Sequence, residues 1–158
     1  MCAAAHLLYC VMQRFLLCSV LLMSVSSFSS GCSNLPAEHT VIKAVQGEVR
    51  IPVKDVNDGK VHFYTYKSEG KRINFFVRTD GKGKLSTHFD ACYTCYKNKK
   101  GYRCEGTDLV CNECNLRFKL AEERWAHEGC SPISLTSRTQ GKDIIIRTDD
   151  LEKGGRLF

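Results

Sequence analysis

The fold class follows from residues 61–90, VHFYTYKSEGKRINFFVRTDGKGKLSTHFD. In Val61–Tyr66 and again in Ile73–Arg78, β-branched and aromatic residues alternate with a period of two, which is typical of β-strands. Turn sequences that contain glycine follow at 68–71 and 79–83, and glycine adopts positive φ without steric cost. The pattern therefore predicts antiparallel strands joined by hairpins.

Two further segments are predicted to be strands, Glu48–Val53 and Asp143–Thr148. Pro52 suits an edge strand, because proline has no backbone N–H to donate to a neighbour. Only Ala121–His127 has a helical pattern. We therefore expect a mainly β protein, a small antiparallel β domain with one short helix and a cysteine-rich insertion from Asp90 to Pro132.

The first residues of the chain have the three parts of a secretory signal. Arg14 precedes an apolar stretch that ends at about Val25, and small residues then lead to Cys32. The apolar stretch is shorter than the roughly 20 residues that span a bilayer, which argues against a transmembrane anchor. We expect residues 1–31 to be removed as a signal peptide, with Met12 as an alternative start.

The end of this signal indicates a lipid anchor. Ser29-Ser30-Gly31-Cys32 resembles a bacterial lipobox, in which the cysteine becomes the lipidated first residue of the mature protein. We therefore expect an exported lipoprotein that is attached through Cys32 to the periplasmic or outer face of a membrane. Residues 32–47 show no sustained periodicity and are expected to be the anchor and its tether, so that the folded domain spans 48–158.

The charge of the chain is mildly basic. The 158 residues carry a net charge of +6, which becomes +5 when residues 1–31 and their single arginine are removed. The excess is concentrated at Lys97, Lys99, Lys100 and Arg103. Such a patch can bind nucleic acid, but this one lies between cysteines of a chain predicted to be exported. We expect a solvated loop beside a negatively charged metal site, and no nucleic-acid partner.

Six of the ten cysteines lie within residues 92–130, and four of them form two C-x2-C pairs. The pairs are Cys92 with Cys95 and Cys111 with Cys114, and fifteen residues separate them. This is the spacing of metal ribbons, in which a hairpin brings two pairs of thiolates to one tetrahedral site. The pairs therefore predict a metal centre.

The residues around the pairs fit the same interpretation. Gly101 and Gly106 suit the connecting hairpin, Asn115 tolerates the left-handed conformation that follows a metal knuckle, and Phe118 can pack over the sulfurs. Asp90, close to Cys92, is expected to accept a hydrogen bond that supports the ligands or to cap a turn, and not to act as a general base.

Other roles for the cysteines stay open. Cys130, in a Gly-Cys-Ser-Pro turn, is a candidate fifth thiol ligand or a disulfide partner of Cys104. All six could instead form three disulfides, as exported proteins often do. A thioredoxin-like site is disfavoured, because it needs a C-x2-C at the start of a helix in a βαβ unit. No catalytic motif accompanies the cysteines, so the sequence favours a binding protein over an enzyme.

The same residues resemble one known family. The run HFDACYTCYKNKKGYRCEGTDLVCNECNLRFKL at 88–120 is preceded by GKVHFYTYKSEGKRINFFV at 59–77 and followed by GCSP at 129–132. Together they resemble the FtrD-like membrane iron-sulfur-containing proteins, over about residues 48–158. The resemblance implies an iron-sulfur or related redox centre and a role beside a high-affinity iron permease.

Charge does not identify the metal, because four thiolates leave about −2 on a Zn(II), a [2Fe–2S] or a [4Fe–4S] centre. The signal has no twin arginine, so the chain is expected to be exported unfolded and could not easily carry a preassembled cluster. Iron-sulfur and zinc therefore both stay open. Copper(I) is a third option, with His88 and His127 as outer candidates.

We therefore expect a metal-binding lipoprotein that acts in electron transfer or metal handling linked to iron uptake. Its expected partners are the membrane and an iron permease or redox protein. The alternative is a structural zinc-ribbon adaptor that binds another protein.

Overall fold

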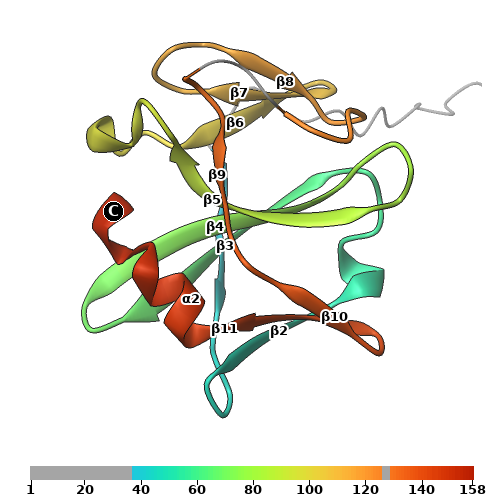
Figure 1. The fold of residues 1–158 in the computed structure, drawn as a ribbon, viewed down its shortest axis with the longest axis vertical. Coiled ribbons are helices and arrows are strands. Elements are labelled where there is room, and N and C mark those ends of the chain that lie inside the picture. Colours follow the sequence, from blue (N-terminus) through green and yellow to red (C-terminus); the bar gives the residue numbers. More distant parts are fainter. Residues whose placement is uncertain (1–36, 126–128) are drawn as a thin grey trace, which may run out of the picture. The chain divides into compact units, whose positions relative to one another are not determined.

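The computed structural model describes residues 37–125 and 129–158, which lie within one compact unit, Gly31–Phe158. The predicted signal peptide, Cys32 and His127 lie outside the described residues. The described chain is mainly β-structure with one short α-helix, which confirms the predicted fold class (Figure 1).

The largest sheet has five strands in the order β1–β3–β4–β5–β9. Their bounds are β1 Thr40–Ile42, β3 Val61–Ser68, β4 Lys71–Thr79, β5 Leu85–Cys92 and β9 Pro132–Ser134. Strand β1 is parallel to β3, and the other pairs are antiparallel. Glu69 and Gly70 form the β3–β4 turn with φ values of 47° and 77°, so the predicted hairpin is confirmed.

A second sheet has three strands in the order β10–β11–β2. Their bounds are β2 Glu48–Pro52, β10 Arg138–Gln140 and β11 Asp143–Arg147. Strand β2 is at the edge of this sheet, as its proline predicts. The single α-helix of the described chain, α2 Thr148–Lys153, follows β11 directly.

The third sheet is formed by the cysteine-rich insertion, in the order β6–β7–β8. Its strands are β6 Tyr102–Glu105, β7 Asp108–Cys111 and β8 Arg117–Lys119. Three short 3-10 helices complete the described elements: η1 Val53–Asp55, η2 Tyr96–Asn98 and η3 Gly155–Leu157.

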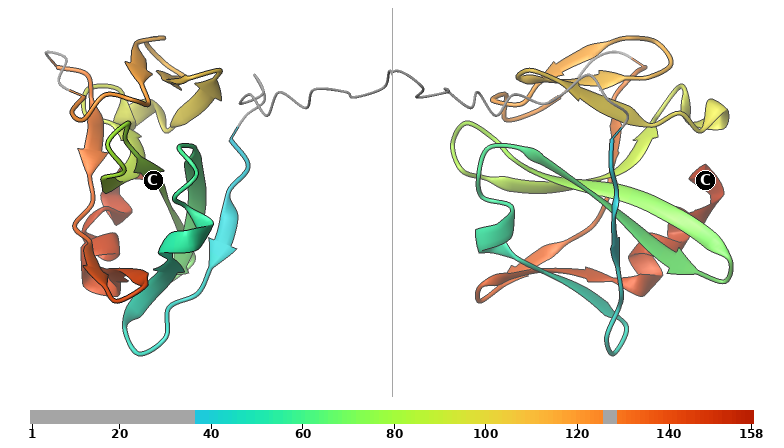
Figure 2. Two further views of the ribbon diagram at one scale, coloured as in Figure 1. Left: turned by 90° about the vertical axis from the view of Figure 1, so that its right-hand side faces the viewer. Right: turned by 180° about the vertical axis from the view of Figure 1, so that it is seen from behind.

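The five-stranded sheet lies between the other two sheets (Figures 1 and 2). One of its faces packs on β2, β11 and α2 through a first core that includes Phe75, Val77 and Ile146. The opposite face packs on β6–β8 through a second core that includes Phe76 and Tyr102. Because neighbouring residues of a strand point to opposite faces, the pair Phe75-Phe76 serves both cores.

The insertion leaves the five-stranded sheet and returns to it at nearly the same point. Strand β5 ends at Cys92, the chain builds the β6–β8 sheet, and β9 then pairs with β5 so that Pro132 lies opposite Cys92. The structure thus agrees with the predicted insertion from Asp90 to Pro132. This return places both ends of the insertion beside the cysteine pairs.

The predicted helix at Ala121–His127 is wrong for its described part, because residues 121–125 are not helical. The backbone carbonyls of Leu120, Glu122 and Glu123 instead accept hydrogen bonds from the guanidinium of Arg78. These carbonyls are therefore bound to a side chain and do not form a helical ladder.

The end of the chain and the start of the domain also differ from expectation. The predicted strand Asp143–Thr148 stops at Arg147, and helix α2 begins at Thr148 with Asp149 and Asp150 in its first turn, where acidic groups are favoured. Strand β1 lies before Glu48, so β-structure begins within the predicted tether. Three residues are too few for their alternation to predict a strand.

Candidate metal centre

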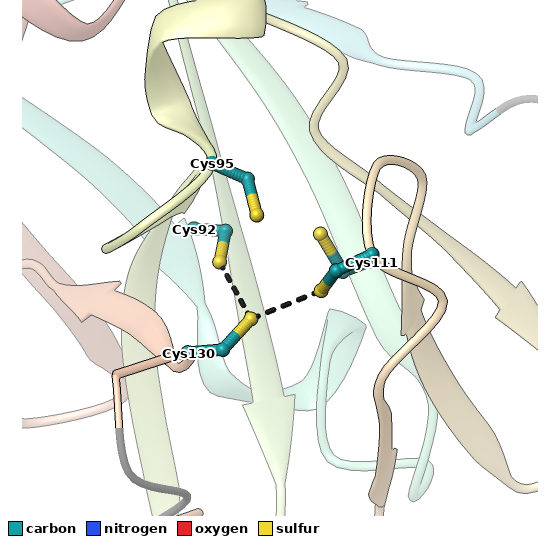
Figure 3. Close-up of side chains that lie close together, drawn as sticks. Cys92, Cys95, Cys111 and Cys130 are labelled. Carbon is teal, nitrogen blue, oxygen red and sulfur yellow. Dashed lines mark hydrogen bonds between the residues drawn. The ribbon is translucent and has the colours of Figure 1, made fainter.

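The structure brings five cysteine thiols together at the end of the five-stranded sheet. The sulfur atoms all lie within 4.8 Å of one another, and the close-up in Figure 3 shows side chains from separate segments converging. The five are those named from the sequence: Cys92, Cys95, Cys111, Cys114 and Cys130. The geometry thus groups every predicted ligand.

Each thiol comes from the end of an element or from a turn. Cys92 and Cys111 are the last residues of β5 and β7, and Cys95 and Cys114 follow in the turns after these strands. Cys130 lies just before β9. Strand ends hold one sulfur of each pair firmly, because their backbone is already paired within a sheet.

Cys130 joins the two pairs. Its Sγ atom lies 2.9 Å from the Sγ of Cys92, as Figure 3 shows, and 3.1 Å from the Sγ of Cys114, both within thiol–thiol hydrogen-bond distance. The candidate fifth thiol therefore contacts one sulfur from each C-x2-C pair.

The two pairs have the same local geometry. The backbone amides of Thr94 and Cys95 point at the Cys92 sulfur, and those of Glu113 and Cys114 point at the Cys111 sulfur. Such amides stabilise negative charge on sulfur. Each pair is therefore built to hold at least one thiolate.

The turn after the second pair also matches expectation. Asn115 has a φ of 56°, the left-handed conformation predicted for this position. Phe118 is buried in the second core with Cys92 and Cys111, where its ring lies edge-on to that of Tyr102 at 6.0 Å between centroids.

The thiols differ in their readiness to ionise. Burial opposes ionisation of Cys92, but hydrogen bonds from Cys130 and from backbone amides outweigh it and lower the pKa of Cys92 to about 7. Burial together with the neighbouring thiols raises the pKa of Cys95 to about 12, and for the same reasons the pKa of Cys130 is raised. Five negative charges at this spacing repel strongly, so a bound cation is needed for most of them to be thiolates at once.

The centre is buried on one side and open on the other. Cys92 and Cys111 are buried, whereas Cys114 is exposed. Tyr93, inside the first pair, is 69% exposed. The thiols can therefore be reached from the surface without opening the sheet.

Asp90 lies close to the thiol group and accepts hydrogen bonds from two other segments of the chain. Its Oδ1 accepts a hydrogen bond from the backbone N–H of Tyr102 at 2.7 Å, and its Oδ2 lies 2.9 Å from Nε2 of His39. Asp90 is therefore a hydrogen-bond acceptor, and these two partners lie outside the group of five thiols. Burial, with nearby thiolate charge, raises the pKa of Tyr102, so its phenol stays protonated.

Two supporting residues were not predicted from the sequence. His39 lies in the predicted tether, and no local pattern links it to Asp90. Arg78, only 2% exposed, holds segment 120–125 and stacks over Trp125 with its guanidinium carbon 3.8 Å from the ring centroid. Arg78 lies two residues after buried Phe76, on the same face of β4, and a charged residue on that face was the available signal.

Two residues considered for the site are not part of the thiol group. His88 packs against the rings of Phe76 and Trp125, at centroid distances of 5.3 and 5.6 Å. Burial and the charge of Arg78 lower the pKa of His88 to about 4. Cys104 is buried in the second core, outside the group of five. The structure thus does not bring His88 to the sulfurs as an outer copper ligand.

Cys130 lies with the other four ligand candidates, and in the described part of the chain it is not joined to Cys104 by a disulfide. Part of the basic patch has partners of its own. Lys100 pairs with Glu113 at 2.7 Å and Arg103 pairs with Glu105 at 2.7 Å. Lys97 and Lys99 are exposed, as expected for a solvated loop.

The donor set has a clear chemical preference. Thiols alone form the group, and thiolates are the ligands of Zn(II), Cu(I) and iron-sulfur centres. The residues therefore fit a soft metal centre.

Comparison with known proteins agrees with this chemistry. In the part of the chain that the structure describes, we find no helix long and apolar enough to cross a membrane. A search of curated proteins gives no significant match. The family model described as membrane iron-sulfur containing protein FtrD-like matches residues 56–158, which include the whole thiol group. Because this match covers more than half of the chain, the protein belongs to the FtrD-like family.

Proposed function

We propose that this protein is an exported lipoprotein whose thiolate metal centre transfers electrons or metal at a membrane surface in support of iron uptake. The observation that carries the proposal is the group of five thiols with one member, Cys114, at the surface. The description of the family as iron-sulfur containing supports a link to iron.

The exposed edge favours exchange over a purely structural role. Structural zinc sites are closed because four protein ligands fill the coordination sphere, whereas here a fifth thiol, Cys130, lies beside the two pairs. Here Cys114 and Tyr93 are exposed beside buried Cys92 and Cys111. A partner that docks at this edge comes close to the sulfurs, which suits transfer of an electron or an ion.

Anchoring supports the same role. We propose that Cys32 carries the lipid and that the residues after it act as the tether. A tether raises the effective concentration of the domain near membrane partners without a large interface. An iron permease or a redox protein in the same membrane is the proposed partner.

We propose a carrier and not an enzyme, because the thiols account for the recognisable chemistry of the chain. The test has two parts: a redox titration of the purified metal-loaded protein, and growth of a deletion strain under iron limitation. We expect a reversible one-electron change or metal transfer to a chelator without unfolding, together with poor growth. A redox-silent zinc that leaves only on unfolding, with normal growth, would instead support the structural adaptor.

A further inference from the structure

We infer that the thiol group binds a single metal ion through four thiolates and does not hold a sulfide-bridged cluster. The inference rests on the proposed metal binding and specifies its form. It departs from the iron-sulfur description of the family, and it follows from the spacing of the sulfurs.

The sulfur positions match the size of a one-ion site. Metal–sulfur bonds of about 2.3 Å in a tetrahedron separate neighbouring sulfurs by about 3.8 Å. The five sulfurs lie within 4.8 Å of one another, and the contacts of Cys130 are 2.9 and 3.1 Å. No two sulfurs of the C-x2-C pairs are therefore farther apart than the tetrahedral separation by more than about 1 Å.

A cluster needs a wider arrangement. In [2Fe–2S] and [4Fe–4S] centres the cysteines bind different irons, and the sulfide-bridged core lies between them. Thiolates on different irons are therefore much farther apart than two thiolates on one ion. No set of four from the group of five has this wide spacing, because every pair is within 4.8 Å.

The space on the buried side of the sulfurs, toward Asp90 and Gly101, is also small. The cavity lined by Cys92, Cys95 and Cys111 has a volume of about 10 Å³. This is room for about one water-sized sphere, whereas a [4Fe–4S] core has four irons and four sulfides. Cys92 and Cys111 end paired strands, opposite Pro132 and Tyr102, so widening the site requires the sheets to move.

The two C-x2-C pairs are the expected ligands of the ion. Both have amides directed at their first sulfur, so they form two equivalent halves of one tetrahedral set. A tetrahedral ion takes four thiolates, which leaves Cys130 as the additional thiol. Its position between Cys92 and Cys114 places it to replace a ligand during exchange.

The test uses the full-length protein, produced with iron and purified without oxygen, alongside the variants Cys111→Ser, Cys130→Ser and Cys104→Ser. Metal content, acid-labile sulfide and the X-ray absorption spectrum of the bound metal are measured. We expect one ion per chain, no labile sulfide, and a metal–sulfur shell with no metal–metal distance. We expect Cys104→Ser to keep the ion, Cys111→Ser to lose most of it, and Cys130→Ser to keep the ion but release it to a chelator more slowly than the wild type.

Each other outcome has a definite meaning. Two or four irons per chain with matching labile sulfide would overturn the single-ion inference and leave the proposed function intact. Absence of any bound metal, in a protein whose circular dichroism shows it to be folded, would overturn both. Loss of the ion from Cys130→Ser at unchanged fold would overturn the assignment of the two pairs as the ligand set.

Discussion

Replacing Gly101 with alanine tests how the metal centre is supported. Gly101 has a φ of 62°, and a Cβ at this position would lie 2.5 and 2.7 Å from the two carboxylate oxygens of Asp90. Asp90 would have to move, although it accepts a hydrogen bond from the backbone of Tyr102 and contacts His39. The substitution therefore combines backbone strain with the loss of a buried support.

The size of the effect can be worked out from these contacts. A left-handed alanine costs about 1–2 kcal/mol. Displacement of Asp90 leaves the buried N–H of Tyr102 unpaired, which costs about 1–3 kcal/mol more. Gly106→Ala is the matched control, because Gly106 has a φ of 60° and a Cβ at that position would have no heavy atom within 4 Å beyond its own chain neighbours. The control carries the strain alone.

The assay is urea denaturation of the wild type and both variants, with the metal content of each sample equal. We expect the free energy of unfolding to fall by about 1–2 kcal/mol in Gly106→Ala and by a further 1–3 kcal/mol, roughly, in Gly101→Ala. Metal affinity should fall only in Gly101→Ala, because the Gly101 carbonyl accepts a hydrogen bond from the backbone of Asn112 at 3.0 Å, inside the second pair. Equal destabilisation of the two variants would refute the role of Asp90.

Three more predictions concern other parts of the molecule. The pKa of His88 is lowered from 6.5 to about 4 in the folded state, so protonation of His88 favours the unfolded state. The free energy of unfolding should therefore be highest above pH 6.5 and fall by up to about 3 kcal/mol as the pH drops towards 4. His88→Phe should remove this slope in denaturation curves measured across that range, and an unchanged slope would assign it to other groups. Arg78→Met should lower the free energy of unfolding by about 3–5 kcal/mol, because three hydrogen bonds from a buried cation are lost. The same variant should be cleaved faster by proteases within residues 120–125. The control Arg124→Met changes an exposed side chain and should alter neither the free energy of unfolding nor the rate of proteolysis. Cys32→Ala should release the protein from membranes in cell fractionation or stall its processing, and normal retention would point to a spanning anchor.

The central strands and the cysteine pairs could be predicted from the sequence because both depend on local patterns. Alternation along Val61–Tyr66 reflects side chains that face two cores, and Gly70 marks the turn where a left-handed backbone is required. The C-x2-C spacing likewise describes a local turn around a sulfur.

The features that could not be predicted from the sequence depend on contacts between residues that are far apart in the chain. His39 and Asp90 are 51 positions apart, and Arg78 contacts carbonyls more than 40 residues away. The helix predicted at Ala121–His127 failed for this reason, because a distant guanidinium binds the carbonyls that a helix would use. Helix α2 was missed because its six residues are too short to show a clear period.

The position of the thiols suits the proposed carrier, which must bind an ion firmly and still exchange it. Cys92 belongs to the five-stranded sheet, whereas Cys111 and Cys114 belong to the turn and strands of the β6–β8 sheet. An ion held by both pairs joins these two layers, so part of its binding free energy stabilises the contact between them. The first core, with β2, β11 and α2, lies on the opposite face of the five-stranded sheet and contains none of the five thiols. For the proposed carrier role, we expect the β6–β8 layer to open locally at exposed Cys114, which would separate the ligands while the remainder of the domain stays folded.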